Sequence, residues 1–128
     1  MINEKTKIKS FTDLIAWQEG HKLVLNMYKL TQTWPKEELF GLMSQIRRAA
    51  VSVTSNLAEG FSRSSWKDKS YFYSMSLGSD TELQNQLLVA KDLKYINNED
   101  FKLVASLTVT VNKLINGLIK SLKQHNTP

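Results

Sequence analysis

Cysteine is absent from the 128-residue sequence. This absence excludes disulfides, thiolate metal sites, iron–sulfur clusters and cysteine nucleophiles, and it fits a reducing compartment. Two prolines and five glycines are too few for a turn-rich all-β fold. No apolar run approaches the roughly 20 residues that a membrane-spanning helix needs, and the first ten residues lack the apolar segment of a signal peptide. We therefore expect a cytoplasmic protein with no membrane partner.

The residues that usually carry catalysis are also scarce. Only two histidines occur, and the sequence has no Glu-x-x-His pair of a di-metal bundle, no nucleophile elbow and no glycine-rich phosphate loop. His21 lies among apolar residues, which favours a structural role over a ligand role. Asp80 and Glu82 are two residues apart and so point to different faces of a helix. We expect no enzyme, no cofactor, no metal and no small-molecule substrate; a deep pocket lined by Glu59, Glu82 and His21 would reopen the question.

Helical periodicity dominates what is present. With 41% hydrophobic and 23% charged residues, the chain has the composition of one globular domain. Apolar residues recur at helical spacing in four stretches separated by short breaks, at residues 13–32, 37–59, 66–94 and 99–123. Because connections this short force neighbouring helices to run antiparallel, we expect an all-α, up-down-up-down four-helix bundle. The bundle would occupy residues 11–123, between a flexible N-terminal arm (1–10) and a C-terminal tail (124–128).

Short polar residues and glycine mark the expected helix ends. Thr12, Ser65 and Asn97 are candidate N-caps, and Gly60 is a candidate C-cap residue. The residues expected to face the core are Leu14, Trp17, His21, Val24 or Leu25, and Tyr28 in the first stretch; Leu39, Leu42, Ile46, Ala49, Val53 and Leu57 in the second; Phe72, Met75, Leu83, Leu87 and Ala90 in the third; and Phe101, Val104, Leu107, Val111, Leu114 and Leu118 in the fourth.

Antiparallel pairing about the turns also sets a register between the helices. In this register several small residues reach the same level along the bundle, which predicts a close helix crossing. A glycine inside a helix costs about 1 kcal/mol of stability relative to alanine, so its presence there is expected to serve close packing. The same register places Arg48 near Glu82, where a structural ion pair is favoured over a functional one. The residues expected at the crossing are Gly20, Ala49, Ala50 and Gly78.

Charge is distributed unevenly over the helices. No charged residue occurs from Ala49 to Ala58, and only Asp80 and Glu82 are charged between residues 70 and 90. A surface poor in Lys and Glu but supplied with Tyr and Arg is typical of a protein interface. We therefore favour self-association into a symmetric oligomer, although small polar side chains could simply tolerate solvent. The candidate interface residues are Gln45, Ser52, Asn56, Tyr71 and Tyr73.

Basic residues exceed acidic ones, for a net charge of +5. They gather on the N-terminal arm, around the turn near residue 63 and along the last helix, where no acid follows Phe101. Phe61 and Trp66 near the turn would suit stacking on single-stranded bases. Nucleic-acid binding and a merely solvated rim are about equally supported by this charge. The residues expected to contact phosphates are Arg47, Arg48, Arg63, Lys67 and Lys69.

Several short motifs follow one another along the chain. They are Phe11-Thr12-Asp13-Leu14 with Trp17-Gln18; Pro35-Lys36-Glu37-Glu38 with Gly41-Leu42; Gln45-Ile46-Arg47-Arg48-Ala49; Ser52 with Asn56-Leu57-Ala58-Glu59-Gly60; Leu77-Gly78-Ser79 with Glu82-Leu83; and Gly117-Leu118-Ile119-Lys120-Ser121-Leu122. Over residues 11–123 this ordered set resembles the bacterial four-helix-bundle proteins encoded in intervening sequences of 23S ribosomal RNA genes.

The resemblance implies a small homo-oligomer, because pentameric rings are known among such proteins. They are also similar to the accessory protein of diversity-generating retroelements, a basic pentamer that works with a reverse transcriptase and RNA. No catalytic residues are established in the family. The leading hypothesis is therefore a non-enzymatic homo-oligomer, with a pentamer favoured, that binds ribosomal or other structured RNA. The alternative is a protein–protein interaction scaffold that binds no nucleic acid.

Overall fold

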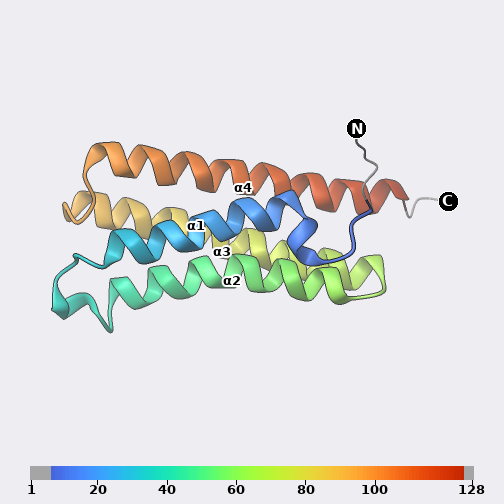
Figure 1. Ribbon diagram of the computed structural model, residues 1–128, viewed down its shortest axis with the longest axis horizontal. Helices are drawn as coiled ribbons and strands as arrows, with labels where there is room; N and C mark the ends of the chain where they lie inside the picture. Colours follow the sequence, from blue (N-terminus) through green and yellow to red (C-terminus); the bar gives the residue numbers. More distant parts are fainter. Residues whose placement is uncertain (1–6, 126–128) are drawn as a thin grey trace.

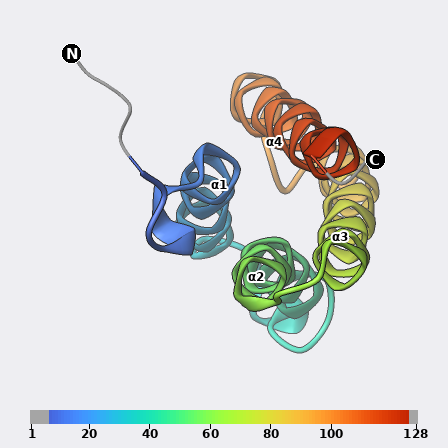
Figure 2. The same ribbon diagram turned by 90° about the vertical axis from the view of Figure 1, so that its right-hand side faces the viewer.

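The computed structural model describes residues 7–125. Within this range the chain forms four long helices and two single-turn 3₁₀ helices and contains no strand, so the predicted all-α bundle is confirmed. The helices run alternately up and down (Figure 1), and each packs beside its neighbours in sequence around a ring that closes between α1 and α4 (Figure 2). The elements are η1 (Phe11–Asp13), α1 (Ile15–Thr31), η2 (Lys36–Glu38), α2 (Leu42–Ser62), α3 (Trp66–Asp92) and α4 (Asn98–His125).

The helical part of the described chain begins at Phe11, as expected, and ends two residues later than expected. Backbone amides of Lys9 and Ser10 donate to the Asp13 carboxylate, and Ser10 caps η1. Helix α4 continues to His125, past the expected start of the tail. The rest of the expected arm and tail, residues 1–6 and 126–128, lies outside the described residues. No helix within residues 7–125 is long and apolar enough to span a membrane.

Side-chain caps start the two longest helices, as predicted. The Ser65 hydroxyl accepts from the backbone N–H of Asp68 at 3.1 Å, and the Asn97 side chain accepts from the N–H of Asp100 at 2.7 Å. Each bond satisfies an amide that the helix itself leaves unpaired. The prediction for Thr12 is wrong: it lies inside η1, and α1 begins after Leu14 without a side-chain cap.

The connection between α1 and α2 is braced by one carboxylate. Glu38 accepts from the backbone N–H of Leu42 at 3.0 Å and from the Tyr95 hydroxyl at 2.8 Å. The first bond caps α2, and the second ties the loop to the α3–α4 connection at the same end of the bundle. Both bonds favour the charged form, and they lower the pKa of Glu38, the Leu42 amide more than Tyr95.

The core confirms the predicted stripe of α2 and corrects those of α1 and α3. In α2, Ile46, Ala49, Val53 and Leu57 are buried, whereas Leu39 precedes the helix and is exposed. Helix α1 turns a different face inward, because small residues sit at its crossing with α2. The buried residues are Ala16, Gly20, Leu23, Met27 and Thr31 in α1, and Tyr73, Ser76, Asp80, Leu83, Gln86, Leu87 and Ala90 in α3; of the predicted residues, His21, Leu25, Tyr28 and Met75 are exposed.

Two glycines mark close approaches between helices. A Cβ on Gly20 would lie 3.0 Å from Cγ2 of Thr54, so a close approach exists at this glycine, but to Thr54 and not to the predicted Ala49 and Ala50. A Cβ on Gly78 would meet nothing within 4 Å, so that part of the prediction is wrong. Gly60 does not end α2 as predicted; it is buried inside the helix, where a Cβ would lie 2.7 Å from the Tyr73 ring.

Candidate nucleic-acid interface

Basic residues that are far apart in the sequence share one end of the bundle. The α2–α3 turn, the start of the described chain and the end of α4 all lie at this end (Figure 1). We call it the basic end. Its acidic residues are Asp13, which binds backbone amides, Glu59, which pairs with Arg63, and Asp68. Its basic residues are Lys7, Lys9, Arg63, Lys67, Lys69, Lys120 and Lys123.

Arg63 and Lys67 are exposed on the α2–α3 turn. The Arg63 guanidinium lies 2.5 Å from the Glu59 carboxylate and 4.7 Å from the centroid of the Phe72 ring. An exposed ion pair of this kind is weak and is screened by salt, so a phosphate can compete for the guanidinium. Trp66 lies on the same turn with about a third of its surface exposed. These side chains form an arrangement that can take a phosphate beside a stacked base.

Lys69 has a structural role at this end. Its ammonium donates to the carbonyl oxygen of Phe61 at 2.7 Å and to that of Gly60 at 3.4 Å, which caps the C-terminal end of α2. It also lies 5.2 Å from the centroid of the Phe61 ring. Partial burial lowers the pKa of Lys69. Among the predicted phosphate ligands, Lys69 is therefore engaged within its own chain.

Arg47 and Arg48 lie away from the basic end. Arg47 is half-buried: its Nε donates to the Thr31 hydroxyl at 2.8 Å, and its guanidinium lies 4.5 Å from the Tyr28 ring centroid. These contacts fasten the end of α1 to α2. Arg48 is exposed and lines a hollow of about 220 Å³ together with Glu82, but these two side chains form no ion pair. Of the five predicted phosphate ligands, the structure groups Arg63, Lys67 and Lys69 and separates this pair.

The outer face of α2 and α3 is almost free of charge. The hydroxyls of Ser52 and Ser79 bond across the two helices at 2.7 Å, and the Asn56 side chain donates to the carbonyl oxygen of Ser52 at 2.9 Å. We call this face the uncharged flank. Its exposed or half-exposed members are Ser52, Ser55, Asn56, Tyr71, Ser74, Met75, Gly78 and Ser79, with Gln45, Arg48 and Glu82 at one limit and Glu59 at the other.

Of the two acids in the middle of α3, Asp80 and Glu82, the first does not lie on this face. Asp80 is fully buried, and neither carboxyl oxygen has a hydrogen-bond partner of good geometry. Burial raises the pKa of Asp80 to about 7, while the nearby Asn112 side chain on α4 opposes the rise. The carboxyl therefore contributes no charge to the outer surface, which makes the flank less charged than its sequence indicates.

The candidate interface residues differ in how accessible they are. Tyr71 is 61% exposed and Gln45 is exposed, whereas Ser52 and Asn56 are half-buried and bonded to each other. The placement of Tyr73 on the outer surface is wrong: only 3% of it is exposed, because its ring packs against Gly60. Helix periodicity missed this because α3 carries polar residues on all faces.

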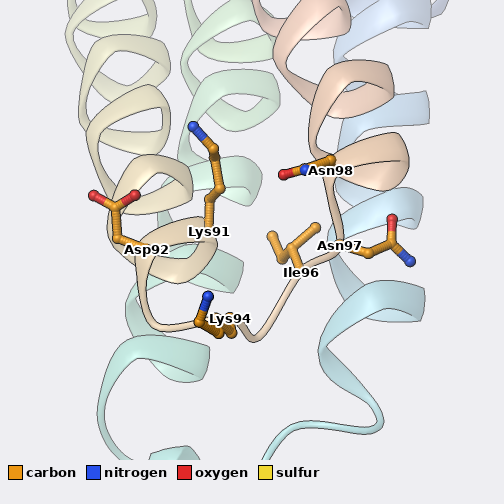
Figure 3. Close-up of a pocket in the computed structure, with 6 residues that line it drawn as sticks. All are labelled: Lys91, Asp92, Lys94, Ile96, Asn97 and Asn98. Atoms are coloured by element: carbon orange, nitrogen blue, oxygen red, sulfur yellow. The ribbon is translucent and has the colours of Figure 1, made fainter.

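A hollow of about 500 Å³ lies at the opposite end, at the α3–α4 connection (Figure 3). Its polar side chains do not converge: Asp92 and Asn97 point to opposite sides (Figure 3), and Asn97 is used as a helix cap. Among residues 7–125, no group of three His, Asp or Glu side chains could hold a metal ion. A pocket lined by Glu59, Glu82 and His21 would have reopened the question of catalysis; Glu82 lines the hollow beside Arg48, and neither His21 nor Glu59 lines that hollow or the one at the α3–α4 connection.

One surface residue that the sequence did not single out is Phe40. It is 93% exposed in the loop between η2 and α2. The only signal in the sequence is an apolar pair, Leu39 and Phe40, directly before Gly41. Such a pair also fits the start of a buried helix, and the apolar pattern accordingly predicted Leu39 in the core.

These features define an antiparallel four-helix-bundle protein with a basic end and an uncharged flank. The chain belongs to the 23S rRNA-intervening sequence protein family, whose model matches residues 12–117; the resemblance seen in the sequence is confirmed. A similar solved structure is that of a protein of unknown function from the S23 ribosomal protein family of Bacteroides thetaiotaomicron VPI-5482. At 19% identity, with 83% of this chain and 96% of the other covered and a TM-score of 0.76, this likeness shows the shared fold. No curated protein matches the chain.

Proposed function

We propose that this chain is a non-enzymatic, homo-oligomeric protein that binds ribosomal or other structured RNA through the basic end of its bundle. The observation that carries the proposal is the meeting of basic residues from the N-terminal segment, the α2–α3 turn and the end of α4 at one end (Figure 1). Phosphate backbones bind such a cluster because neutralising lysines and arginines release counterions.

Self-association would enlarge the positive electrostatic field of the basic end. Tyr71 and Met75 are exposed on the uncharged flank. Along this flank, Glu82 is the one exposed acidic residue of α3. Covering such a face with a second copy costs little desolvation of charge. In a cyclic oligomer whose axis runs along the bundle, all basic ends would point the same way and form one basic ring. The family resemblance favours a pentamer.

Charge reversal tests the RNA proposal. The double variant R63E/K67E is expected to weaken binding to a labelled 23S rRNA fragment at least tenfold at about 0.1 M salt. It should also reduce the slope of log K against log salt by roughly 1 to 2, because about one phosphate contact is lost per basic residue. Fluorescence anisotropy over a salt series measures both quantities.

A matched control separates a local site from general electrostatics. The variant K29E/K94E makes the same change in net charge at exposed residues near the opposite end. It should retain most of the affinity and the wild-type salt slope. Binding that is independent of salt, or that falls equally in both double variants, would contradict the assignment to the basic end.

The alternative is a scaffold whose only ligands are proteins. The uncharged flank supports it, because a surface suited to another copy also suits a partner chain. Purification from cells distinguishes the two functions. A nucleic-acid-free absorbance ratio, combined with no shift on adding ribosomal RNA fragments, favours the scaffold.

A further inference from the structure

Phe40 is exposed to solvent on a loop whose backbone is braced by hydrogen bonds. Its side chain is 93% exposed, and Leu39 beside it is about half exposed. The backbone around it is fixed, because the Glu38 carboxylate binds the Leu42 amide and the Tyr95 hydroxyl, and the Gly41 amide donates to the Glu38 carbonyl at 3.0 Å. A large aromatic side chain exposed on a loop whose backbone is hydrogen-bonded on both sides is the kind of group that anchors protein interfaces.

A hollow of matching size and polarity lies between α3 and α4. Its volume is about 190 Å³, close to the roughly 150 Å³ of an apolar cavity that accepts benzene. No charged side chain lines it, and its polar members Gln84 and Thr108 bond to each other at 3.2 Å. The residues that line it are Gln84, Leu87, Leu88, Phe101, Ala105, Thr108 and Val109.

The two features lie at the same height along the bundle. Phe40 lies two residues before α2, and the hollow begins at Leu88 near the end of α3 and Phe101 near the start of α4, from where it extends inward to Gln84 and Val109. Both therefore belong to the end opposite the basic end (Figure 1). Phe40 does not fill the hollow of its own chain, because 93% of it is exposed; α2, which follows it, lies across the bundle from α4 (Figure 2).

We propose that Phe40 of one subunit inserts into the α3–α4 hollow of the next copy of the chain. The contact is heterologous, and a rotation about an axis parallel to the helices preserves height, which is the condition for a closed ring. Charge agrees with this pairing: exposed Glu37 lies three residues before Phe40 in the chain, and exposed Lys102 directly follows Phe101, which lines the hollow. The inference rests on the proposed self-association and adds an anchoring contact to the one that the uncharged flank supplies.

The available area is sufficient for a stable interface. Helix α3 has 27 residues, so it is about 40 Å long, and two adjacent helices present a strip about 20 Å wide. This strip gives about 800 Å² per partner, the size of a standard protein interface. Phe40 and its hollow would supply the anchor, and the weakly charged faces along the helices would supply the remaining contact.

Complementary variants test the contact by size exclusion coupled to light scattering. F40S removes the anchor, and V109R places a charge at the mouth of the hollow on a residue that is 46% exposed. Each variant alone is expected to elute as a 14.7 kDa monomer. An equimolar mixture is expected to form a dimer of twice that mass and nothing larger, because only one intact Phe40 can meet one intact hollow.

Exposed apolar residues elsewhere provide the controls. L25S on α1 and L103R on α4 alter side chains that are 57% and 62% exposed and do not line the hollow; both should keep the wild-type mass. Circular dichroism confirms that each variant is folded. An oligomeric wild type with unchanged F40S and V109R, or a mixture that stays monomeric, would refute the contact alone. A monomeric wild type would refute the proposed self-association and this contact with it.

Discussion

Asp80 is expected to make the stability of the fold fall as pH rises. Its carboxyl is fully buried, lacks a well-placed donor, and has a pKa raised from 3.8 to about 7 by burial. Between these two pH values the folded chain holds the proton and the unfolded chain releases it. The free energy of unfolding therefore decreases from about pH 4 to pH 7 and receives no further loss from this group above pH 7.

The size of the effect follows from the pKa difference. Each pKa unit corresponds to about 1.4 kcal/mol, so Asp80 costs up to about 4 kcal/mol at pH 8 and about 1–2 kcal/mol at pH 5. Relaxation and water around the carboxylate reduce the net cost to about 2–4 kcal/mol at pH 8. D80N keeps the shape and cannot ionise, so it should be more stable than the wild type at pH 8 by about this amount.

Urea unfolding at fixed protein concentration measures the difference. Far-UV circular dichroism of wild type and D80N from pH 4 to pH 8 gives two stability curves, and the change of their difference with pH isolates the carboxyl from all other groups. D92N, on the exposed side of the same helix, is the control and should differ little from the wild type. A difference between wild type and D80N that stays constant with pH, or that favours the wild type more as pH rises, would refute the reasoning.

Three further substitutions test individual contacts. G60A should destabilise the fold by about 1–3 kcal/mol, because the added methyl would lie 2.7 Å from the buried Tyr73 ring. G78A should be neutral or stabilising by up to about 1 kcal/mol, because a methyl there meets nothing within 4 Å. Thermal melts compare the two variants, and equal effects would contradict the packing described. E38Q should lower stability at pH 7 but not at acid pH, because the hydrogen bonds that lower the pKa of Glu38 stabilise only its charged form, which is lost as pH falls below about 4.5; urea curves at both pH values decide this. R47A should lower the free energy of unfolding by about 1–2 kcal/mol, because a hydrogen bond and a ring contact are lost. It should leave the salt slope of RNA binding unchanged; a reduced slope would show that Arg47 contacts the RNA.

The sequence predicts α2 well because its apolar residues alternate at three-four spacing. Ile46, Val53 and Leu57 stand on one stripe, with polar residues elsewhere, so only one face can be buried. The number of helices and their antiparallel order follow from the same pattern and from the short connections. The caps at Ser65 and Asn97 follow from residue type alone.

The faces of α1 and α3 could not be predicted in the same way. In α3, the hydroxyl of Ser76 donates to the buried carbonyl of Val53 at 2.7 Å, and Asp80 is buried nearby, so polar residues occupy the core face. In α1, Ala16 and Gly20 face the core because they are small. Size and tertiary hydrogen bonds decide both faces, and neither is visible in hydrophobic periodicity.

The basic end was only partly visible in the sequence. Clusters of basic residues could be located along the chain, but their meeting at one end depends on the bundle's topology (Figure 1). The individual roles of Arg47 and Lys69 depend on distances to carbonyl and hydroxyl oxygens, which spacing along one helix does not give. The exposure of Phe40 could not be predicted from the sequence, because it results from the loop conformation that Glu38 fixes.

The mass of the protein in solution, with and without RNA, tests the central claim most directly. Size exclusion coupled to light scattering on the wild-type chain should give a single multiple of 14.7 kDa at low salt. Adding a 23S rRNA fragment should raise the mass of that peak, and about 0.5 M salt should reverse the increase without dissociating the oligomer into monomers. A single 14.7 kDa species that ignores the RNA at every salt concentration would contradict both the self-association and the RNA binding proposed for this chain.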